Sequence, residues 1–222
     1  TDKNGSFTLD NIASLSFYGE TFLMSISFSL IATVVCLLIG YPLAYFMSKT
    51  KPKTQMALML LIMLPMWVSL LIRTYSLMAL LDNGGTDAAV ILGMIYDFLP
   101  YMVLPIFTSM TKIDRSLCEA AMDLGCSNFR VITRVIMPLT VSGVVSGITM
   151  VFVPSISTFY ISQKLGGGKL DLIGDTIERQ FQNSSTYHVG AAISLVMMIL
   201  ILISLTVMNR FSDDAEEGGM IV

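Results

Sequence analysis

Long apolar runs separated by short polar connections dominate the pattern of this chain. Five such runs lie at residues 21–48, 55–81, 88–111, 135–163 and 189–209. Only Arg73 in the second run and Asp97 in the third interrupt them with charge. Each run reaches or exceeds the roughly 20 residues that an α-helix needs to cross about 30 Å of hydrocarbon. The pattern therefore predicts an all-α membrane protein with five spanning helices, two of which carry a single ionisable side chain.

The composition supports this fold class. Hydrophobic residues make up 54% of the chain and charged residues only 13%, whereas soluble domains carry roughly a quarter charged residues. The net charge of −3 offers no basic surface, so we expect no nucleic-acid partner. Cys36 lies in the first run, and Cys118 and Cys126 lie in a polar connection, which does not form a disulfide framework.

Positive charge falls on alternate connections between the runs. It is carried there by Lys49, Lys51, Lys53, Lys112, Arg115, Arg130, Arg134 and Arg210. The positive-inside rule places these connections and the C-terminus in the cytoplasm. We therefore expect an extracellular segment 1–19, a transmembrane domain 20–210 with a cytoplasmic loop 112–134 and an outer loop 163–187, and a cytoplasmic acidic tail 211–222.

Five spans and a cytoplasmic C-terminus put the N-terminus outside the cell. Residues 1–19 contain no apolar stretch that could carry this polar segment across a membrane. We therefore expect a sixth spanning helix upstream of Thr1. The short connection 82–87, with Gly84 and Gly85, fits a tight hairpin, and a longer loop with further residues there is the alternative.

The polar run 112–134 has the pattern of two short helices joined by a turn. An apolar face at i, i+3, i+4 and i+7 is formed by Leu117, Ala120, Ala121 and Leu124. Asp114 or Ser116 can cap the first helix, and Glu119 has capping-box spacing from Ser116. Gly125 fits a left-handed helix end, and the second helix leads through Pro138 into the fourth span.

These residues resemble a known signature. Glu119-Ala120-Ala121, then Gly125, then Val135-Ile136-Met137-Pro138 are similar to the E-A-A-x3-G-x9-I-x-L-P motif of bacterial ABC-importer permeases. Val135 and Met137 replace the usual Ile and Leu and keep the apolar character. The resemblance implies a type I importer permease bundle in the bacterial inner membrane, surrounded by lipid.

The resemblance also implies partners. In this family the first helix of the loop docks into a groove of a separate ATPase subunit, so Leu117, Glu119, Ala120, Ala121, Leu124, Gly125 and Pro138 are the expected coupling residues. ATP and Mg would be bound by that ATPase, with no cofactor in this chain. A second homologous permease would complete the pathway, and a substrate-binding protein would deliver cargo to the outer loop.

Shorter motifs indicate the cargo. Residues 40–44 (Gly-Tyr-Pro-Leu-Ala), 73–75 (Arg-Thr-Tyr) and 165–168 (Leu-Gly-Gly-Gly) look like the spermidine/putrescine branch of the family. The resemblance thus implies import of polyamines by alternating access. The alternatives are a permease for another small cationic or amino-acid-like solute, an ion-coupled secondary transporter, and an intramembrane enzyme.

The two charges inside spans have two interpretations. Burial of a charged side chain in the membrane costs at least about 2.5–3.5 kcal/mol, which favours an ion pair between Arg73 and Asp97 or a water-filled cavity around each. In the second interpretation Asp97 receives a substrate ammonium group. Aromatic faces for a cation would then come from Trp67, Tyr75, Tyr96 and Tyr160.

Other features predict packing rather than chemistry. The segment Gly166-Gly167-Gly168-Lys169 is not a phosphate-binding loop, since Gln163 stands where its first glycine belongs and Leu170 where its hydroxyl residue belongs. His188 is the sole histidine, and no catalytic or metal site is predicted around it. Ser142-Gly143 and Ser146-Gly147 form a small-xxx-small stripe that predicts tight helix packing.

Overall fold

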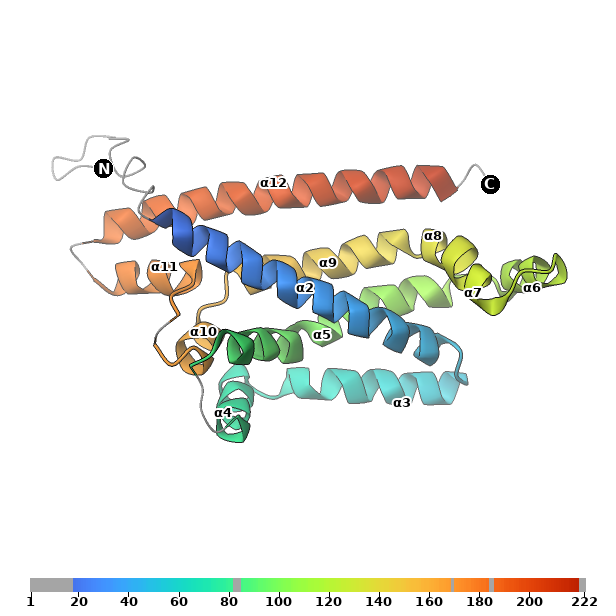
Figure 1. The fold of residues 1–222 in the computed structure, drawn as a ribbon, viewed down its shortest axis with the longest axis horizontal. Coiled ribbons are helices and arrows are strands. Elements are labelled where there is room, and N and C mark those ends of the chain that lie inside the picture. The colour runs from blue at the N-terminus through green and yellow to red at the C-terminus, as the bar shows by residue number, and fades with distance from the viewer. Residues whose placement is uncertain (1–17, 82–84, 169, 184–185, 220–222) are drawn as a thin grey trace. The chain divides into compact units, whose positions relative to one another are not determined.

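The computed structural model describes residues 18–81, 85–168, 170–183 and 186–219, with the backbone alone at 115 and 211–219. The predicted extracellular segment, apart from its last two residues, and the tip of the 82–87 connection lie outside the described residues. Every regular element in the described part is helical (Figure 1). In chain order the elements are α2 (Gly19–Ser48), α3 (Pro52–Met63), the 3₁₀ turn η2 (Leu64–Trp67), α4 (Leu70–Leu80), α5 (Asp87–Thr111), α6 (Arg115–Asp123), α7 (Asn128–Val131), the π-helical turn η3 (Ile132–Ile136), α8 (Met137–Leu139), α9 (Val141–Ile156), α10 (Tyr160–Leu165), α11 (Ile173–Gln182) and α12 (Tyr187–Gly219).

Three of the described helices are long and apolar enough to cross a membrane unbroken. They are α2, α5 and the part of α12 up to Arg210. The number of spans reaches five only if each of two broken helix pairs counts as one span. The prediction that 55–81 and 135–163 form continuous helices is therefore wrong, although both segments stay predominantly helical and apolar.

The first break follows a proline. The helix α3 begins at Pro52, whose fixed φ suits the first helical position. Further along, Pro65 has no N–H to donate to the helix, and the chain tightens there into the 3₁₀ turn η2. Val68 and Ser69 then separate this turn from α4.

The second break lies at Thr140. The segment Asn128–Leu139 is bent by 67° relative to α9, and Thr140 is the residue between them. The fully buried Thr140 hydroxyl donates to the carbonyl oxygen of Ile136 at 2.9 Å. It lies 3.1 Å from the Tyr41 hydroxyl, which then acts as the donor to Thr140. Side-chain hydrogen bonds thus support the bend, and the pattern of apolar residues could not predict them.

The chain divides into two compact units, which are described separately. The first contains the described parts of Thr1–Ala32, Val68–Tyr96 and Phe152–Ser204. Its core is a cluster of Ile156, Ile173, Ile193 and Met197, against which Phe22, Ile26, Phe152 and other side chains pack. The backbone N–H of Ile173 donates to the Ser25 hydroxyl at 2.8 Å, which attaches the start of α11 to α2. The predicted outer loop is therefore folded, with α11 as its main element.

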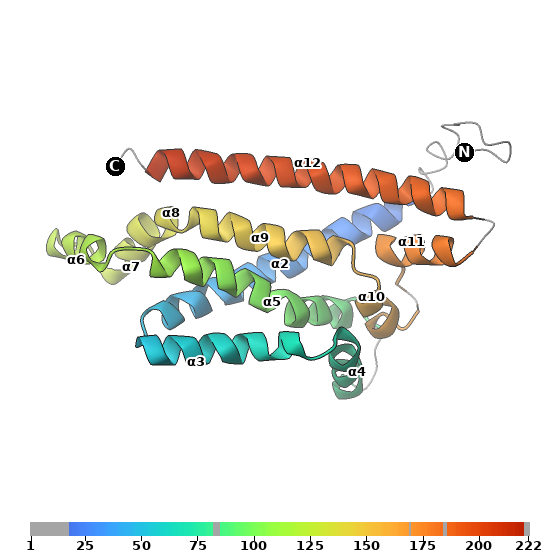
Figure 2. The same ribbon diagram turned by 180° about the vertical axis from the view of Figure 1, so that it is seen from behind.

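The second unit contains Thr33–Trp67, Asp97–Val151 and the described part of Leu205–Val222. Within it, the second half of α5 and the first part of α9 lie side by side in both views (Figures 1 and 2). A Cβ atom added to Gly143 would lie 2.5 Å from Ser109 Cβ and 2.8 Å from the Pro105 carbonyl oxygen. One added to Gly147 would lie 2.8 Å from Met102 Sδ. The predicted tight packing of the small-xxx-small stripe is confirmed.

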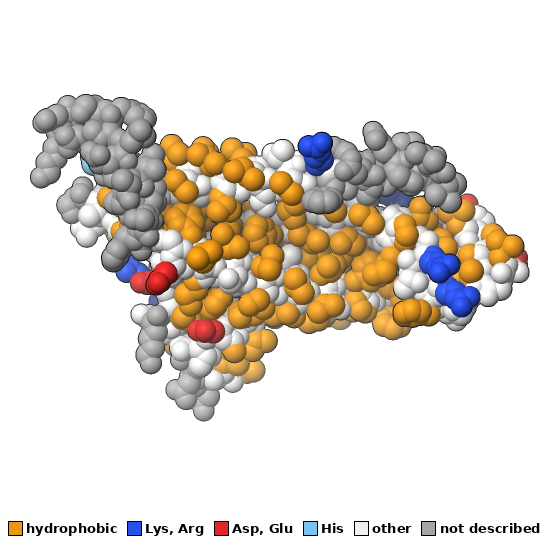
Figure 3. Space-filling model, turned by 45° about the horizontal axis from the view of Figure 1, so that its top comes forward, with side chains coloured by type: hydrophobic (Ala, Val, Ile, Leu, Met, Phe, Trp, Pro, Cys, Tyr) orange, Lys and Arg blue, Asp and Glu red, His pale blue; other side chains and the backbone are white. Residues whose placement is uncertain are grey.

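The surface is rich in apolar side chains (Figure 3). Leu38 on α2 is 67% exposed and Ile203 on α12 is 60% exposed, and many other large apolar residues on these helices are also accessible. A soluble protein rarely exposes contiguous apolar surface on this scale, whereas lipid covers it in a membrane protein. The helix α12 continues past Arg210 into the predicted acidic tail and ends at Gly219.

Candidate functional site

The loop between the third and fourth runs folds into the two predicted short helices. Asp114 caps α6, with its Oδ1 atom accepting the Ser116 backbone N–H at 3.0 Å, so Asp114 fills the capping role for which Ser116 was the alternative. This hydrogen bond lowers the pKa of the Asp114 carboxyl. Gly125 has a φ of 83°, which confirms the predicted left-handed helix end. Ser127 then precedes α7 as its N-cap residue.

The predicted apolar face of α6 is accessible. Leu117 is 50% exposed and Leu124 is 86% exposed, Ala120 is exposed and Ala121 is half-buried. By contrast, Cys118 is buried, which shows that the helix packs against its own unit through a different face. Phe129 on α7 is 73% exposed, a residue that the sequence analysis did not select. An apolar surface at the end of a polar loop is thus available to a partner.

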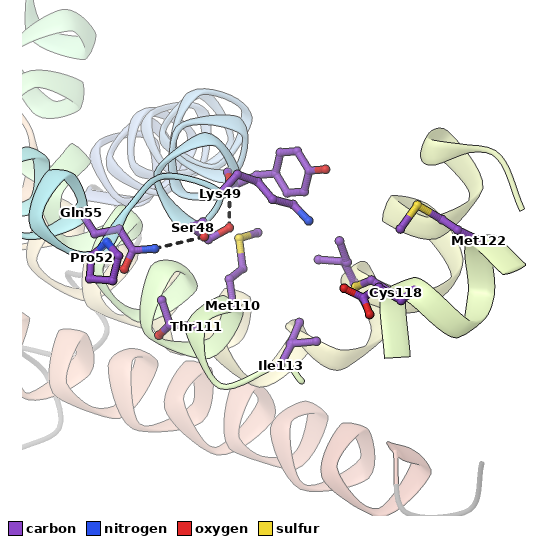
Figure 4. A pocket seen from close by; sticks show the side chains of 12 residues that line it. Ser48, Lys49, Pro52, Gln55, Met110, Thr111, Ile113, Cys118 and Met122 are labelled. Carbon is purple, nitrogen blue, oxygen red and sulfur yellow. Dashed lines mark hydrogen bonds between the residues drawn. The ribbon is translucent and has the colours of Figure 1, made fainter. Parts of the chain in front are cut away.

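Behind α6 lies a cavity of about 350 Å³ (Figure 4). Glu119, Cys118 and Met122 line it from α6, and Lys49 lines it just after the end of α2. Figure 4 shows the Lys49 amino group directed toward this space. Its Nζ atom also lies 5.4 Å from the centroid of the Tyr45 ring. Glu119, predicted from its spacing to belong to a capping box with Ser116, instead lines this cavity, because Asp114 caps α6.

The wall of this cavity is fixed by hydrogen bonds at the α2–α3 turn. Gln55 Nε2 donates to the Ser48 carbonyl oxygen and to the Thr50 carbonyl oxygen, each at 3.1 Å. The Gln55 side chain thus joins α3 to the turn, and the Thr50 hydroxyl adds a hydrogen bond to the Met47 carbonyl oxygen at 2.8 Å. Pro138, the last residue of the coupling signature, is exposed in α8 directly before the bend at Thr140.

A second cluster lies in the first unit. The Lys164 Nζ atom is 5.6 Å from the centroid of the Tyr75 ring and 5.9 Å from that of Tyr160. Tyr75 is on α4, and Tyr160 and Lys164 are on α10, which packs against α4. The structure thus brings together two of the aromatic residues that were predicted to face a cation.

The other predicted pathway residues have different settings. Tyr96 on α5 is 43% exposed in the first unit, and Trp67 at the end of η2 is 77% exposed in the second. Asp97 is buried on α5 in the second unit, whereas Arg73 is half-buried on α4 in the first. Whether Arg73 and Asp97 pair, or Asp97 contacts substrate, therefore stays a prediction.

Lys164 was missed in the sequence although a signal for it existed. It follows Tyr160 by four residues, and side chains at this spacing are neighbours on a helix surface. The apolar pattern predicts one span over 135–163, which ends before Lys164. The structure instead starts a new helix at Tyr160.

Comparison with known proteins identifies the family. Residues 37–215 match the model of the binding-protein-dependent transport system inner membrane component family. The spermidine/putrescine transport system permease protein PotB of Salmonella typhimurium (strain SL1344) is 39% identical over 93% of this chain and 79% of its own length. PotB of Escherichia coli (strain K12) is 38% identical over 93% of this chain and 83% of its own length.

Solved structures share the fold. An inward-facing structure of the MetNI methionine ABC transporter gives a TM-score of 0.71 at 14% identity, covering 88% of this chain and 94% of that one. A bacterial ABC transporter involved in import of the acidic polysaccharide alginate gives 0.72 at 18% identity, covering 96% of this chain and 85% of that one. With its apolar helices, its folded 112–134 loop and these matches, the chain belongs to the family of binding-protein-dependent transport system inner membrane components, as a multi-pass permease subunit of an ABC importer and not an enzyme.

Proposed function

We propose that this chain is the permease subunit through which an ABC importer moves polyamines such as spermidine and putrescine inward. The observation that supports this most strongly is the 39% identity, over 93% of the chain, to a spermidine/putrescine transport system permease. The solved importers of methionine and of alginate share the fold at low identity, so the fold alone does not choose the cargo. Another small cationic or amino-acid-like solute is the second candidate.

In this proposal α6 is the coupling helix. The exposed Leu117 and Leu124, with Ala120 and Ala121 between them, fit a groove on a separate ATPase subunit. That subunit binds ATP and Mg, and its closure moves α6. The movement reaches α9 through α7, the π turn η3 and α8, whose last residue adjoins the hydrogen-bonded Thr140. Gly125 and Pro138 act in this path as turn and helix-entry residues, and Glu119 lines the cavity behind α6.

The remaining partners follow from the same orientation. The loop 112–134 and the C-terminus face the cytoplasm, and the outer loop 163–187, built on α10 and α11, faces a substrate-binding protein. A second related permease pairs with this chain, and lipid covers the exposed apolar side chains of α2 and α12. The positive charge on the 112–134 loop supports this orientation.

Transport by the reconstituted assembly tests the proposal. The permease, its ATPase, the paired permease and the binding protein would be placed in liposomes with radiolabelled spermidine on the binding-protein side. We expect ATP-dependent uptake that unlabelled putrescine or spermidine competes away. If the assembly takes up another solute but neither polyamine, that solute and not a polyamine is the cargo. Uptake that continues without the ATPase would contradict the whole mechanism.

A further inference from the structure

The Tyr75–Tyr160 cluster is the feature of the first unit that no assigned role explains. Both rings lie within 6 Å of the same ammonium group, that of Lys164. An ammonium over the face of a tyrosine is attracted by the ring quadrupole, and two rings reinforce the attraction. The two tyrosines come from α4 and α10, which lie far apart in the sequence, so the arrangement is a product of the fold.

The backbone holds α10 firmly behind this cluster. Ile161, Ser162 and Leu165 are buried, so one face of α10 is fixed in the core of the unit. The Leu165 carbonyl oxygen accepts the Gly85 backbone N–H at 2.6 Å. Tyr160 and Lys164 stand on the remaining, half-buried face. The position of the Lys164 stem is therefore set by the helix rather than by a flexible loop.

The carboxylates near this part of α10 are engaged elsewhere. Glu178 accepts hydrogen bonds from Gln163 and Gln182, and Asp171 pairs with Arg179. Among the described carboxylates, none forms an ion pair with Lys164 within 4.0 Å. Tyr75 and Tyr160 are thus the partners of the Lys164 ammonium among the described residues, and the Tyr75 hydroxyl interacts with it in addition to the two rings.

We propose that Tyr75 and Tyr160 form a binding site for alkylammonium groups, and that Lys164 occupies it as a tethered competitor when substrate is absent. This inference rests on the proposed function, because a cargo with primary ammonium groups is needed to displace Lys164. The end of a polyamine is a methylene chain carrying a primary ammonium group, as is the end of a lysine side chain. A site that binds the end of a lysine side chain therefore also binds the end of a polyamine. Competition with Lys164 then sets the polyamine concentration that half-fills the site.

Removal of the tethered amine should strengthen binding of the cargo. Lys164→Met keeps the length of the side chain and removes its charge. A cation–π contact at a half-exposed site corresponds to about a two- to fivefold change in an equilibrium constant. We therefore expect the KM for spermidine uptake by the assembled transporter to fall by about two- to fivefold in Lys164→Met.

Further variants test whether the two tyrosines are responsible. Lys164→Arg keeps a cation over the rings and should not show the fall in KM. Lys53→Met removes an exposed lysine of α3 that belongs to neither site, and it controls for loss of charge alone. Adding Tyr75→Leu to Lys164→Met should abolish the gain. An unchanged or higher KM in Lys164→Met, or the same fall in Lys53→Met, would overturn the inference.

A second measurement separates this inference from the proposed function. Lysines of the assembled transporter would be labelled as ¹³C-dimethyl-lysine, and the Lys164 signal would be identified by its loss in Lys164→Arg. The ring currents should move this signal upfield in wild type, and Tyr160→Leu should return it toward the position of a free lysine. Spermidine should do the same by displacing Lys164 from the rings.

The outcomes are distinct. If polyamines are transported but spermidine leaves the Lys164 signal unmoved, the tethered-competitor inference is wrong and the proposed function stands. If polyamines are not transported but another cation both enters and moves the signal, the site is supported and the cargo is reassigned. If the signal has no upfield shift, the site itself is refuted, whatever the cargo.

Discussion

The Asp175 carboxyl lies near the start of α11, where it is only 2% exposed. Its Oδ2 atom accepts the Leu172 backbone N–H at 2.8 Å. Burial raises the pKa of Asp175 from its ordinary value of 3.8 to about 6, because the charged form loses its hydration, and interactions with the Ser162 side chain and the Leu172 backbone N–H offset only part of this effect. The segment lies outside the helices that could span the membrane, so its surroundings can be titrated from solution.

This pKa predicts a pH-dependent stability. Because the folded protein binds the proton more tightly than the unfolded chain, the free energy of unfolding should fall as pH rises from about 4 to about 6 and level off above that. Asp175→Asn removes the titration. We expect its melting temperature, relative to wild type, to rise across this interval and then to stay constant.

Thermal unfolding of the full-length protein in detergent at a series of pH values measures this difference. Asp123→Asn, which removes an exposed carboxyl on α6, is the control for loss of a carboxyl alone. A difference between Asp175→Asn and wild type that does not change between pH 4 and pH 6 would contradict the assignment.

At the residue scale, the sequence predicted backbone conformation where a single residue type determines it. Gly125 was identified as a left-handed residue, and it has a φ of 83°. Asp114 was one of two possible caps, and only the structure selects it. The i, i+4 spacing of Tyr160 and Lys164 is a local signal for one contact, but the contact of Lys164 with Tyr75 on α4 could not be predicted from local spacing. Contacts between distant helices require the fold.

At the scale of helices, the α5–α9 contact depends on the absence of side chains. A methyl group at Gly143 would lie 2.5 Å from Ser109 Cβ and 2.8 Å from the Pro105 carbonyl oxygen, and a backbone atom cannot move aside as a flexible side chain can. Gly143→Ala should therefore destabilise the protein by about 1–3 kcal/mol, the usual range for overpacking. Thermal stability of the detergent-solubilised protein, read as the fraction that stays monodisperse after heating, measures this loss.

The control for this variant is Gly19→Ala at the start of α2. A Cβ atom there meets nothing within 4 Å, and its backbone is helical. Gly19→Ala should leave stability within about 0.5 kcal/mol of wild type. Alanine has a higher helix propensity than glycine, so equal losses in the two variants would contradict close packing at Gly143 as the cause of its loss.

Apolar length predicted the five helical segments but not their breaks. Residues 55–81 and 135–163 were each expected to form one helix, and both are interrupted. Pro65 carries a local signal for the first break. The second depends on the Thr140 hydroxyl and its bond to Tyr41, a residue 99 positions away, so a pattern of apolar residues along the sequence could not show it. The close packing at Gly143, by contrast, follows from small residues at regular spacing and was predicted.

At the scale of the whole molecule, the family could be predicted from one motif. Glu119, Gly125 and Pro138 at fixed spacing identify the loop, and the match to residues 37–215 places nearly the whole chain in that family. The cavity bounded by Lys49 and Glu119 could not be predicted, since it is formed by segments that are far apart in sequence. The class of transporter could thus be predicted from the sequence, whereas the surfaces available to its partners are seen only in the structure.

The exposed apolar face of α6, which includes Leu117 and Leu124, gives the most direct test of the proposed coupling to an ATPase. Leu124 is 86% exposed, so Leu124→Asp should change the stability of the permease by less than about 0.5 kcal/mol. If Leu124 enters an apolar groove of the ATPase, a buried unpaired carboxylate in the complex should weaken association by at least about tenfold. Co-purification of the ATPase with tagged permease measures the association, and substrate-stimulated ATP hydrolysis measures the coupling. Leu124→Met, which keeps the volume and the apolar character, should retain both. Normal ATPase recovery and normal coupling in Leu124→Asp would show that this face of α6 does not dock the ATPase.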